Sequence, residues 1–151
     1  MVCPFYRGKI TCVTKFKPRE HASIDFLGFT HYWRKNRRGS WSIRRKTMKS
    51  RLARAVKAIG HWCRSNRHKS LPEQYVKLCS KIRGHYAYFG IRGNSESLGR
   101  FLYLVRRLWI KWLRRRSQRY RLSWGGAERL LQRYPLLVVR LSVVRPAKVM
   151  N

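Results

Sequence analysis

The side chains with the clearest chemical pattern in this sequence are the cations of residues 98–116, which read LGRFLYLVRRLWIKWLRRR. At about 100° per residue on a helical wheel, the apolar side chains fall within one arc and the cations fall on the opposite side. The apolar arc consists of Leu98, Phe101, Leu102, Val105, Leu108, Trp109, Trp112 and Leu113, and the cationic side of Arg100, Arg107, Lys111 and Arg114. The segment is therefore predicted to be a helix that packs one side in a core and directs the other at anions.

The charge of the whole chain indicates which anions these are. The 151 residues include 37 Lys and Arg but only 5 Asp and Glu, so the formal net charge is +32 and the pI is near 11.6. The charged side of a helix is usually only solvated, with acids interleaved among the cations. Here almost no acids neutralise the cations, and self-repulsion on this scale opposes folding unless a polyanion or salt screens it. Nucleic acid is the predicted partner.

The acidic residues argue against catalysis by this chain. Nucleotidyl transfer with two metal ions normally needs several converging carboxylates. The acids of the chain are far apart in the sequence: Glu20, Asp25, Glu73, Glu96 and Glu128. The chain is therefore not expected to be an enzyme or to hold a cofactor.

The cysteines do not form a metal-binding pattern. Neither a C-x-x-C pair nor a zinc-finger spacing occurs among Cys3, Cys12, Cys63 and Cys79. Reduced thiols of a cytoplasmic protein are therefore favoured over a metal site. The N-terminus lacks the apolar run of a signal peptide, and no stretch approaches the roughly 20 apolar residues of a membrane span. A cytoplasmic location and no membrane partner are expected.

The composition also predicts a packed structure. Hydrophobic residues make up 44% of the chain and aromatic residues 13%, which argues against a disordered basic tail. The fold class expected is mainly α, with a three-helix bundle preceded by a small β-hairpin and followed by a short helix. Residues 1–23 show no clear period, residues 24–46 read as the hairpin, residues 47–118 as the three helices, and residues 119–151 as a basic linker, short helix and tail.

The hairpin is predicted to pair residues 26–33 with residues 40–46, and Asn36 and Gly39 supply the turn. Gly28 then lies inside the first strand, which indicates a bulge or a close approach of another backbone. The two strands are expected to pack on the helices or to belong to a larger sheet, since an isolated hairpin is only marginally stable.

Residues that favour helix ends indicate where each helix begins and ends. Thr47 or Ser50 is expected to cap the first helix, and Ser70 the second, which ends at Gly90. Ser123 is expected to cap a short final helix that ends near Tyr134.

The cations of these elements are the candidate contacts to the phosphates of a nucleic acid. His85, Tyr86 and Tyr88 are candidates for stacking on bases, although Tyr86 continues an apolar stripe and is favoured as a core residue. The predicted phosphate contacts are Arg44, Arg45, Lys46, Lys49, Arg51, Arg64, Arg67, Lys69, Arg83, Arg107, Lys111, Arg114, Arg115 and Arg119.

Several motifs resemble the C-terminal part of reverse transcriptase/maturases encoded by group II introns. They are DFLGFTHYW at residues 25–33, RRKT at 44–47, KIRGHYAYFGIRGN at 81–94 and FLYLVRRLWIKWLRRRSQ at 101–118, followed by the SW and RLLQRYPL of residues 123–136. The resemblance implies that DFLGF is similar to the end of the polymerase palm. It also implies that the three helices are similar to the thumb, also called domain X or the maturase-specific region.

In that family the corresponding region grips intron RNA during splicing, and in the full-length protein it also holds the primer–template duplex. The resemblance therefore implies group II intron RNA as a partner, with primer–template or target DNA as a further one. The chain departs from the family in having no adjacent Asp pair, so the catalytic acids of the palm are missing. A truncated maturase that binds RNA without chemistry of its own is the leading prediction.

Three alternatives stay open. The chain is also compatible with one part of a split RNA-directed DNA polymerase that needs a separately encoded palm. A generic basic nucleic-acid-binding protein of ribosomal or nucleoid type fits the composition equally well. Basic helices rich in Trp also bind anionic lipid, but the family resemblance disfavours that interpretation.

Overall fold

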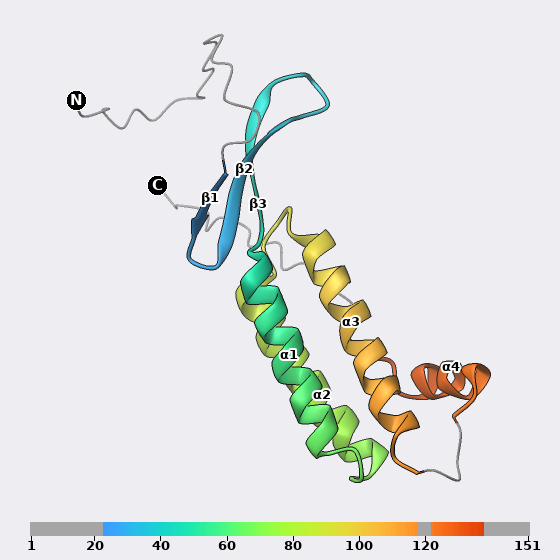
Figure 1. Cartoon of the computed structure of the whole chain (residues 1–151). Coiled ribbons are helices and arrows are strands. Elements are labelled where there is room, and N and C mark those ends of the chain that lie inside the picture. Colours follow the sequence, from blue (N-terminus) through green and yellow to red (C-terminus); the bar gives the residue numbers. More distant parts are fainter. Residues whose placement is uncertain (1–22, 118–121, 138–151) are drawn as a thin grey trace, which may run out of the picture.

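A computed structural model of the chain describes residues 23–117 and 122–137, which form a small sheet followed by helices (Figure 1). The strands are β1 (Ser23–Phe26), β2 (Phe29–Lys35) and β3 (Trp41–Thr47). The helices are α1 (Lys49–Ser65), α2 (Leu71–Phe89), α3 (Ser95–Arg114) and α4 (Trp124–Arg133). This arrangement confirms the predicted mainly-α class, with a β element before the helices and a short helix after them.

The sheet differs from the predicted hairpin because it has three strands, in the antiparallel order β1-β2-β3. The prediction placed Phe26 and Gly28 in one strand, whereas Phe26 ends β1 and Phe29 begins β2. The chain reverses at Leu27 and Gly28, which both have positive φ (47° and 80°). Two consecutive positive φ angles are the pattern of a type I′ hairpin turn, whose twist matches that of the flanking strands.

The turn between β2 and β3 forms where it was predicted. The Asn36 side-chain oxygen accepts hydrogen bonds from the backbone N–H groups of Arg38 (2.9 Å) and Ser40 (3.0 Å). Gly39 has a positive φ of 77°, a conformation that other residues rarely adopt.

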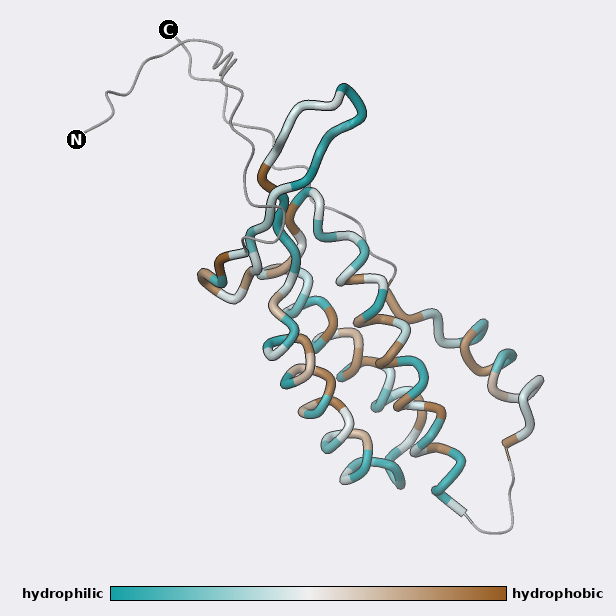
Figure 2. The backbone as a smooth tube through the Cα atoms, turned by 45° about the horizontal axis from the view of Figure 1, so that its top comes forward, coloured by the Kyte–Doolittle hydropathy of each residue, from teal (hydrophilic) through white to brown (hydrophobic). Residues whose placement is uncertain are grey.

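Helix α3 supplies most of the hydrophobic core. Six residues of its predicted apolar arc are buried: Leu98, Phe101, Leu102, Val105, Trp109 and Leu113. Leu108 and Trp112 are half-buried at the edge of the arc, and Leu108 lies against Gly60 of α1. Leu78 and Ile82 of α2 complete the core from the other side. Apolar positions accordingly recur along each helix in Figure 2, interleaved with polar ones.

Two buried polar side chains tie the core to its surroundings. The amide group of Asn94 accepts a hydrogen bond from the Thr47 backbone N–H (2.9 Å) and donates to the Thr47 hydroxyl and the Phe89 carbonyl, both at 2.8 Å. These bonds join the end of β3 to the turn between α2 and α3. The predicted cap of α1 is wrong, because Met48 is the residue before the helix and makes no side-chain capping bond, while Thr47 bonds to Asn94.

Helix α4 packs on the lower part of the bundle in Figure 1 and begins at the predicted cap. The Ser123 side chain accepts a hydrogen bond from the Gly126 N–H at 3.2 Å. The ring of Tyr134 lies 5.4 Å from that of Tyr75 in α2, and the Tyr75 hydroxyl donates to the Pro135 carbonyl at 3.1 Å. These contacts place the cations of α4 beside the start of α2. Residues 138–151 of the predicted tail lie outside the described residues.

Candidate nucleic-acid interface

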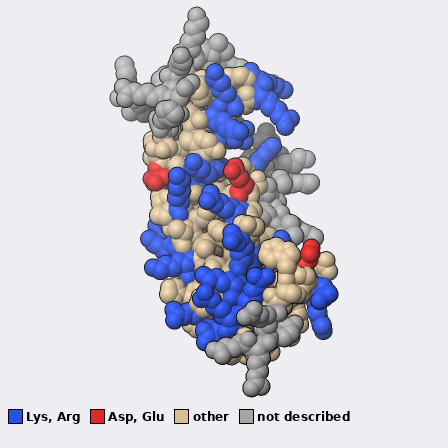
Figure 3. Space-filling view, turned by 45° about the vertical axis from the view of Figure 1, so that its right-hand side comes forward, with Lys and Arg blue, Asp and Glu red and all other residues tan. Residues whose placement is uncertain are grey.

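Lysine and arginine side chains cover much of the face in Figure 3, from the sheet to the opposite end of the helices, with few acids among them. The predicted phosphate contacts that the structure describes are all exposed except Arg67, which is half-buried. Arg119 lies outside the described residues. The predicted cations are therefore accessible to a ligand, and their positions determine which of them can contact the same ligand.

Three cations lie near the ring of Trp112, where α1 and α3 end. The guanidinium carbons of Arg64 and Arg115 lie 5.9 Å and 5.5 Å from the ring centroid, and the Lys111 Nζ lies 5.8 Å from it. Each distance is within the range of a cation–π interaction. A guanidinium that stacks on a ring keeps its planar set of N–H donors available for phosphate oxygens. We call these four residues the Trp112 cluster.

The loop between α1 and α2 lies at the same end of the bundle, and its backbone is held from inside. The buried Gln74 side chain donates to the carbonyl of Lys69 at 2.8 Å and to that of Arg67 at 3.3 Å. Its oxygen accepts a hydrogen bond from the Trp109 indole N–H at 2.9 Å. These bonds fix the backbone of the loop, and the Lys69 side chain is exposed. Arg67 instead donates to the His68 ring at 2.9 Å.

The exposed side of α3 continues this basic surface. Arg107, Lys111 and Arg114 recur at intervals of four and three residues, which corresponds to about 6 Å and about 4.5 Å of helix length. The Arg107 guanidinium lies 5.7 Å from the ring of Tyr103, and that of Arg114 lies 5.7 Å from the ring of Trp124 in α4. Aromatic rings therefore orient cations along the helix.

The structure separates the predicted contacts of the sheet. The register places Arg44 and Lys46 on one face together with Tyr32, and Arg45 on the other face beside His31. The Lys46 Nζ lies 4.9 Å from the Tyr32 ring centroid. These three consecutive cations cannot all contact one ligand surface.

The remaining predicted contacts lie on two helices. Lys49 and Arg51 are in the first turn of α1, next to the sheet, and Arg83 is exposed on α2. They are not part of the Trp112 cluster.

Of the predicted stacking rings, only Tyr88 is largely exposed, at 55%. Its hydroxyl donates to the Leu27 carbonyl at 2.8 Å, and its ring stacks on Phe29 of the sheet. Tyr86 is half-buried and packs against the hydrophobic core, as the apolar stripe predicted. His85 stacks on Phe101 with the ring centroids 3.8 Å apart, so its ring is already engaged inside the protein.

The burial of His85 predicts a pH-dependent stability. Burial disfavours the charged imidazolium and lowers the pKa of His85 from 6.5 to about 4. Between these values the unfolded chain binds a proton that the folded chain does not. The stability that neutral His85 contributes is therefore complete above pH 6.5 and is lost as the pH falls toward 4.

Urea unfolding at a series of pH values measures this loss. His85→Phe keeps a ring against Phe101 without a titrating group, and it is expected to lose less free energy of unfolding across the same interval. An equal loss in both proteins would show that other groups cause the pH dependence.

The thiols and the acids define no second chemical centre in the described residues. Cys63 and Cys79 are free and buried, and burial raises the pKa of the Cys63 thiol to about 12. Cys3 and Cys12 lie outside the part of the chain that the structure describes. Within that part, no group of three or more His, Cys, Asp or Glu side chains is placed to hold a metal ion. No helix within residues 23–117 and 122–137 has both the length and the apolar character needed to cross a membrane.

Three arginines that the sequence analysis did not select line a hollow between α2 and α4: Arg116, Arg129 and Arg133. Arg129 and Arg133 are four residues apart on α4, a spacing that places them on the same side of a helix and marks them as a pair. The sequence does not indicate that α4 packs against the start of α2. It therefore could not predict that Arg116 lies near Arg129 and Arg133.

Comparisons of the chain with protein-family models, with curated proteins and with solved structures found no match. The function is therefore argued from the geometry of the basic surface and from the sequence motifs.

Proposed function

We propose that this chain is an RNA-binding module without catalytic activity that grips folded RNA through the basic end of its helix bundle. The observation that carries the proposal is the Trp112 cluster, where Arg64 of α1, Lys111 of α3 and Arg115 just after α3 lie within 6 Å of one indole ring. Like charges repel one another, so their convergence at one ring favours a polyanionic ligand that bridges them. The loop between α1 and α2, whose Lys69 carbonyl accepts a hydrogen bond from Gln74, adds the exposed Lys69 side chain to this end of the bundle.

RNA is favoured over duplex DNA by an exposed ring on this surface and by the sequence motifs. The ring of Trp124 is 79% exposed and lies 5.7 Å from the guanidinium carbon of Arg114, so it suits an unpaired base of a folded RNA. The resemblance to the thumb of group II intron maturases supports intron RNA as the target and assistance to splicing as the role. A cytoplasmic location belongs to the same proposal.

The salt dependence of RNA binding tests the electrostatic basis of this proposal. Each phosphate contact contributes about −0.7 to the slope of log affinity against log salt on single-stranded RNA. If the Trp112 cluster and Lys69 all contact phosphates, the slope is expected to be about −3 or steeper. Filter binding to a group II intron RNA, with a generic RNA duplex as competitor, measures the slope and the preference together.

Two results would contradict the proposal. Affinity that hardly changes between low and moderate salt would exclude phosphate contacts as its main source. Equal competition by the generic duplex would favour a generic basic protein over a maturase module.

A second candidate function is favoured by one face of the sheet. Ile24, Phe26 and Ile43 share this face and are 71%, 61% and 59% exposed. An exposed apolar patch on a small sheet is typical of a protein interaction site. We therefore keep as the alternative a split RNA-directed DNA polymerase, in which a separately encoded palm covers this face. Primer extension by the chain with and without a palm fragment separates the two functions, because an RNA-binding module gives no product in either case.

A further inference from the structure

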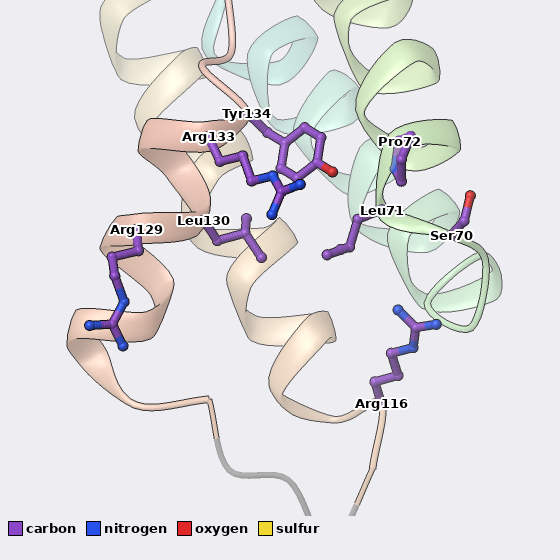
Figure 4. A pocket seen from close by; sticks show the side chains of 8 residues that line it. All are labelled: Ser70, Leu71, Pro72, Arg116, Arg129, Leu130, Arg133 and Tyr134. Atoms are coloured by element: carbon purple, nitrogen blue, oxygen red, sulfur yellow. The ribbon is translucent and has the colours of Figure 1, made fainter.

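A hollow of about 440 Å³ lies between the start of α2 and helix α4 (Figure 4). Ser70, Leu71 and Pro72 form the α2 side, and Leu130 and Tyr134 form the α4 side. The volume falls within the range of sites that hold small ligands. Among the described residues that line it, none is acidic.

The charged groups of the hollow converge from two elements. In Figure 4 the Arg116 side chain, just after α3, and the Arg133 side chain of α4 extend toward the hollow from opposite sides, while the Arg129 side chain, one turn earlier in α4, points away from them. Arg116 is held by a hydrogen bond from its Nη2 to the His68 carbonyl at 3.2 Å. The guanidinium of Arg133 lies 6.0 Å from the Tyr134 ring. Both groups are thus partly oriented before a ligand arrives.

A ligand for this hollow needs an anionic part and an apolar, planar part. Guanidinium groups match the oxygens of a phosphate through paired N–H donors. The first turn of α2 adds a positive dipole end, and the Ser70 side chain makes no capping hydrogen bond there. Leu71, Leu130 and Tyr134 offer an apolar wall a short distance from the arginines. A nucleotide has both parts, whereas inorganic phosphate leaves the wall empty and an apolar ligand leaves the arginines unpaired.

We propose that the hollow receives one unpaired nucleotide of the bound RNA. Its phosphate is held by Arg116 and Arg133, and its base lies against Leu71, Leu130 and Tyr134. This inference rests on the proposed RNA-binding function and specifies an unpaired segment as what the chain recognises. Single-stranded loops are where proteins read unstacked bases, because the bases of an RNA helix are not accessible to side chains in its narrow major groove.

A comparison of two RNA probes tests the inference. One probe is an RNA hairpin with a uridine-rich loop, and the other is a blunt duplex with the same stem sequence. The variant Arg116→Gln/Arg129→Gln/Arg133→Gln is expected to bind the hairpin about tenfold more weakly, with a much smaller loss on the duplex. The control Arg37→Gln/Arg38→Gln/Arg92→Gln removes the same charge from exposed positions elsewhere, and its effect on the two probes is expected to be small and equal.

The outcomes separate this inference from the proposed function. Equal losses on the two probes in the first variant overturn the nucleotide site but leave RNA binding in place. If the unaltered chain binds neither probe in a salt-dependent way, the proposed function fails as well.

Two measurements on the unaltered chain do not depend on the folding of a variant. With 4-thiouridine in the loop of the hairpin, photocrosslinks are expected in the α4 segment that contains Leu130 and Tyr134, and crosslinks confined to other segments overturn the inference. AMP in excess is expected to displace the hairpin only weakly, because it lacks the neighbouring phosphates. AMP binding as tight as that of the hairpin would identify a free nucleotide as the ligand and overturn the proposal that the nucleotide belongs to RNA.

Discussion

Replacement of Trp109 by alanine is expected to lower the free energy of unfolding by about 3–5 kcal/mol. Trp109 is the largest fully buried side chain in the part of the protein that the structure describes, and its indole N–H donates to the buried Gln74 oxygen at 2.9 Å. The substitution leaves a cavity in the core and removes the donor of Gln74, and both effects destabilise the fold. Because small domains are stable by only about 5–15 kcal/mol, this loss removes a substantial fraction of the free energy of unfolding.

Urea unfolding followed by circular dichroism measures this effect. Trp124→Ala is the matched control, since this tryptophan is 79% exposed and its removal is expected to change stability by less than about 0.5 kcal/mol. Similar losses in the two variants would mean that Trp109 is not the centre of the core.

The helices could be predicted from the sequence because their pattern is local. The spacing of Leu98, Phe101, Val105 and Trp109 repeats at helical intervals over several turns, and burial of that side follows directly. The end of α2 at Gly90 and the start of α4 after Ser123 were also marked by single residues with strong terminal preferences.

The first strand could not be predicted because its turn lacks the usual sequence. Hairpin turns of two residues are commonly Asn-Gly or Asp-Gly, since both residues need positive φ. In this chain Leu27 occupies the first position at φ 47°, so the sequence reads as one continuous strand. Contacts distant in sequence stabilise the turn instead, because Tyr88 donates to the Leu27 carbonyl and Met48 N–H donates to the Gly28 carbonyl.

The candidate site was only partly predictable for a similar reason. Exposure of single cations follows from the apolar pattern, but their grouping depends on which helix ends meet. Trp112 packs against the core, as predicted, but its half-buried ring also lies beside Arg64 of α1 and Arg115 at the end of α3, which the sequence did not indicate. The separation of Arg44 from Arg45 could have been predicted, because neighbouring side chains of a strand point to opposite faces of the sheet.

Removal of the cations of the Trp112 cluster is expected to have the largest effect on RNA binding. The variant Arg64→Gln/Lys111→Gln/Arg115→Gln loses three exposed charges that converge on one ring. At roughly 1 kcal/mol for each lost phosphate contact, affinity is expected to fall about 100-fold. The salt slope is expected to become shallower by about 2, because three contacts no longer displace counterions.

The control for this variant must carry the same net charge. Arg37→Gln/Arg38→Gln/Arg92→Gln meets that condition, and its slope is expected to stay close to that of the unaltered chain. The variant Trp112→Leu keeps every cation but removes the ring that orients them, so its affinity is expected to fall while its slope changes little. If the cluster variant and the charge-matched control lose affinity and slope to the same extent, total charge alone drives binding, and the convergence of these cations on Trp112 has no role in recognition.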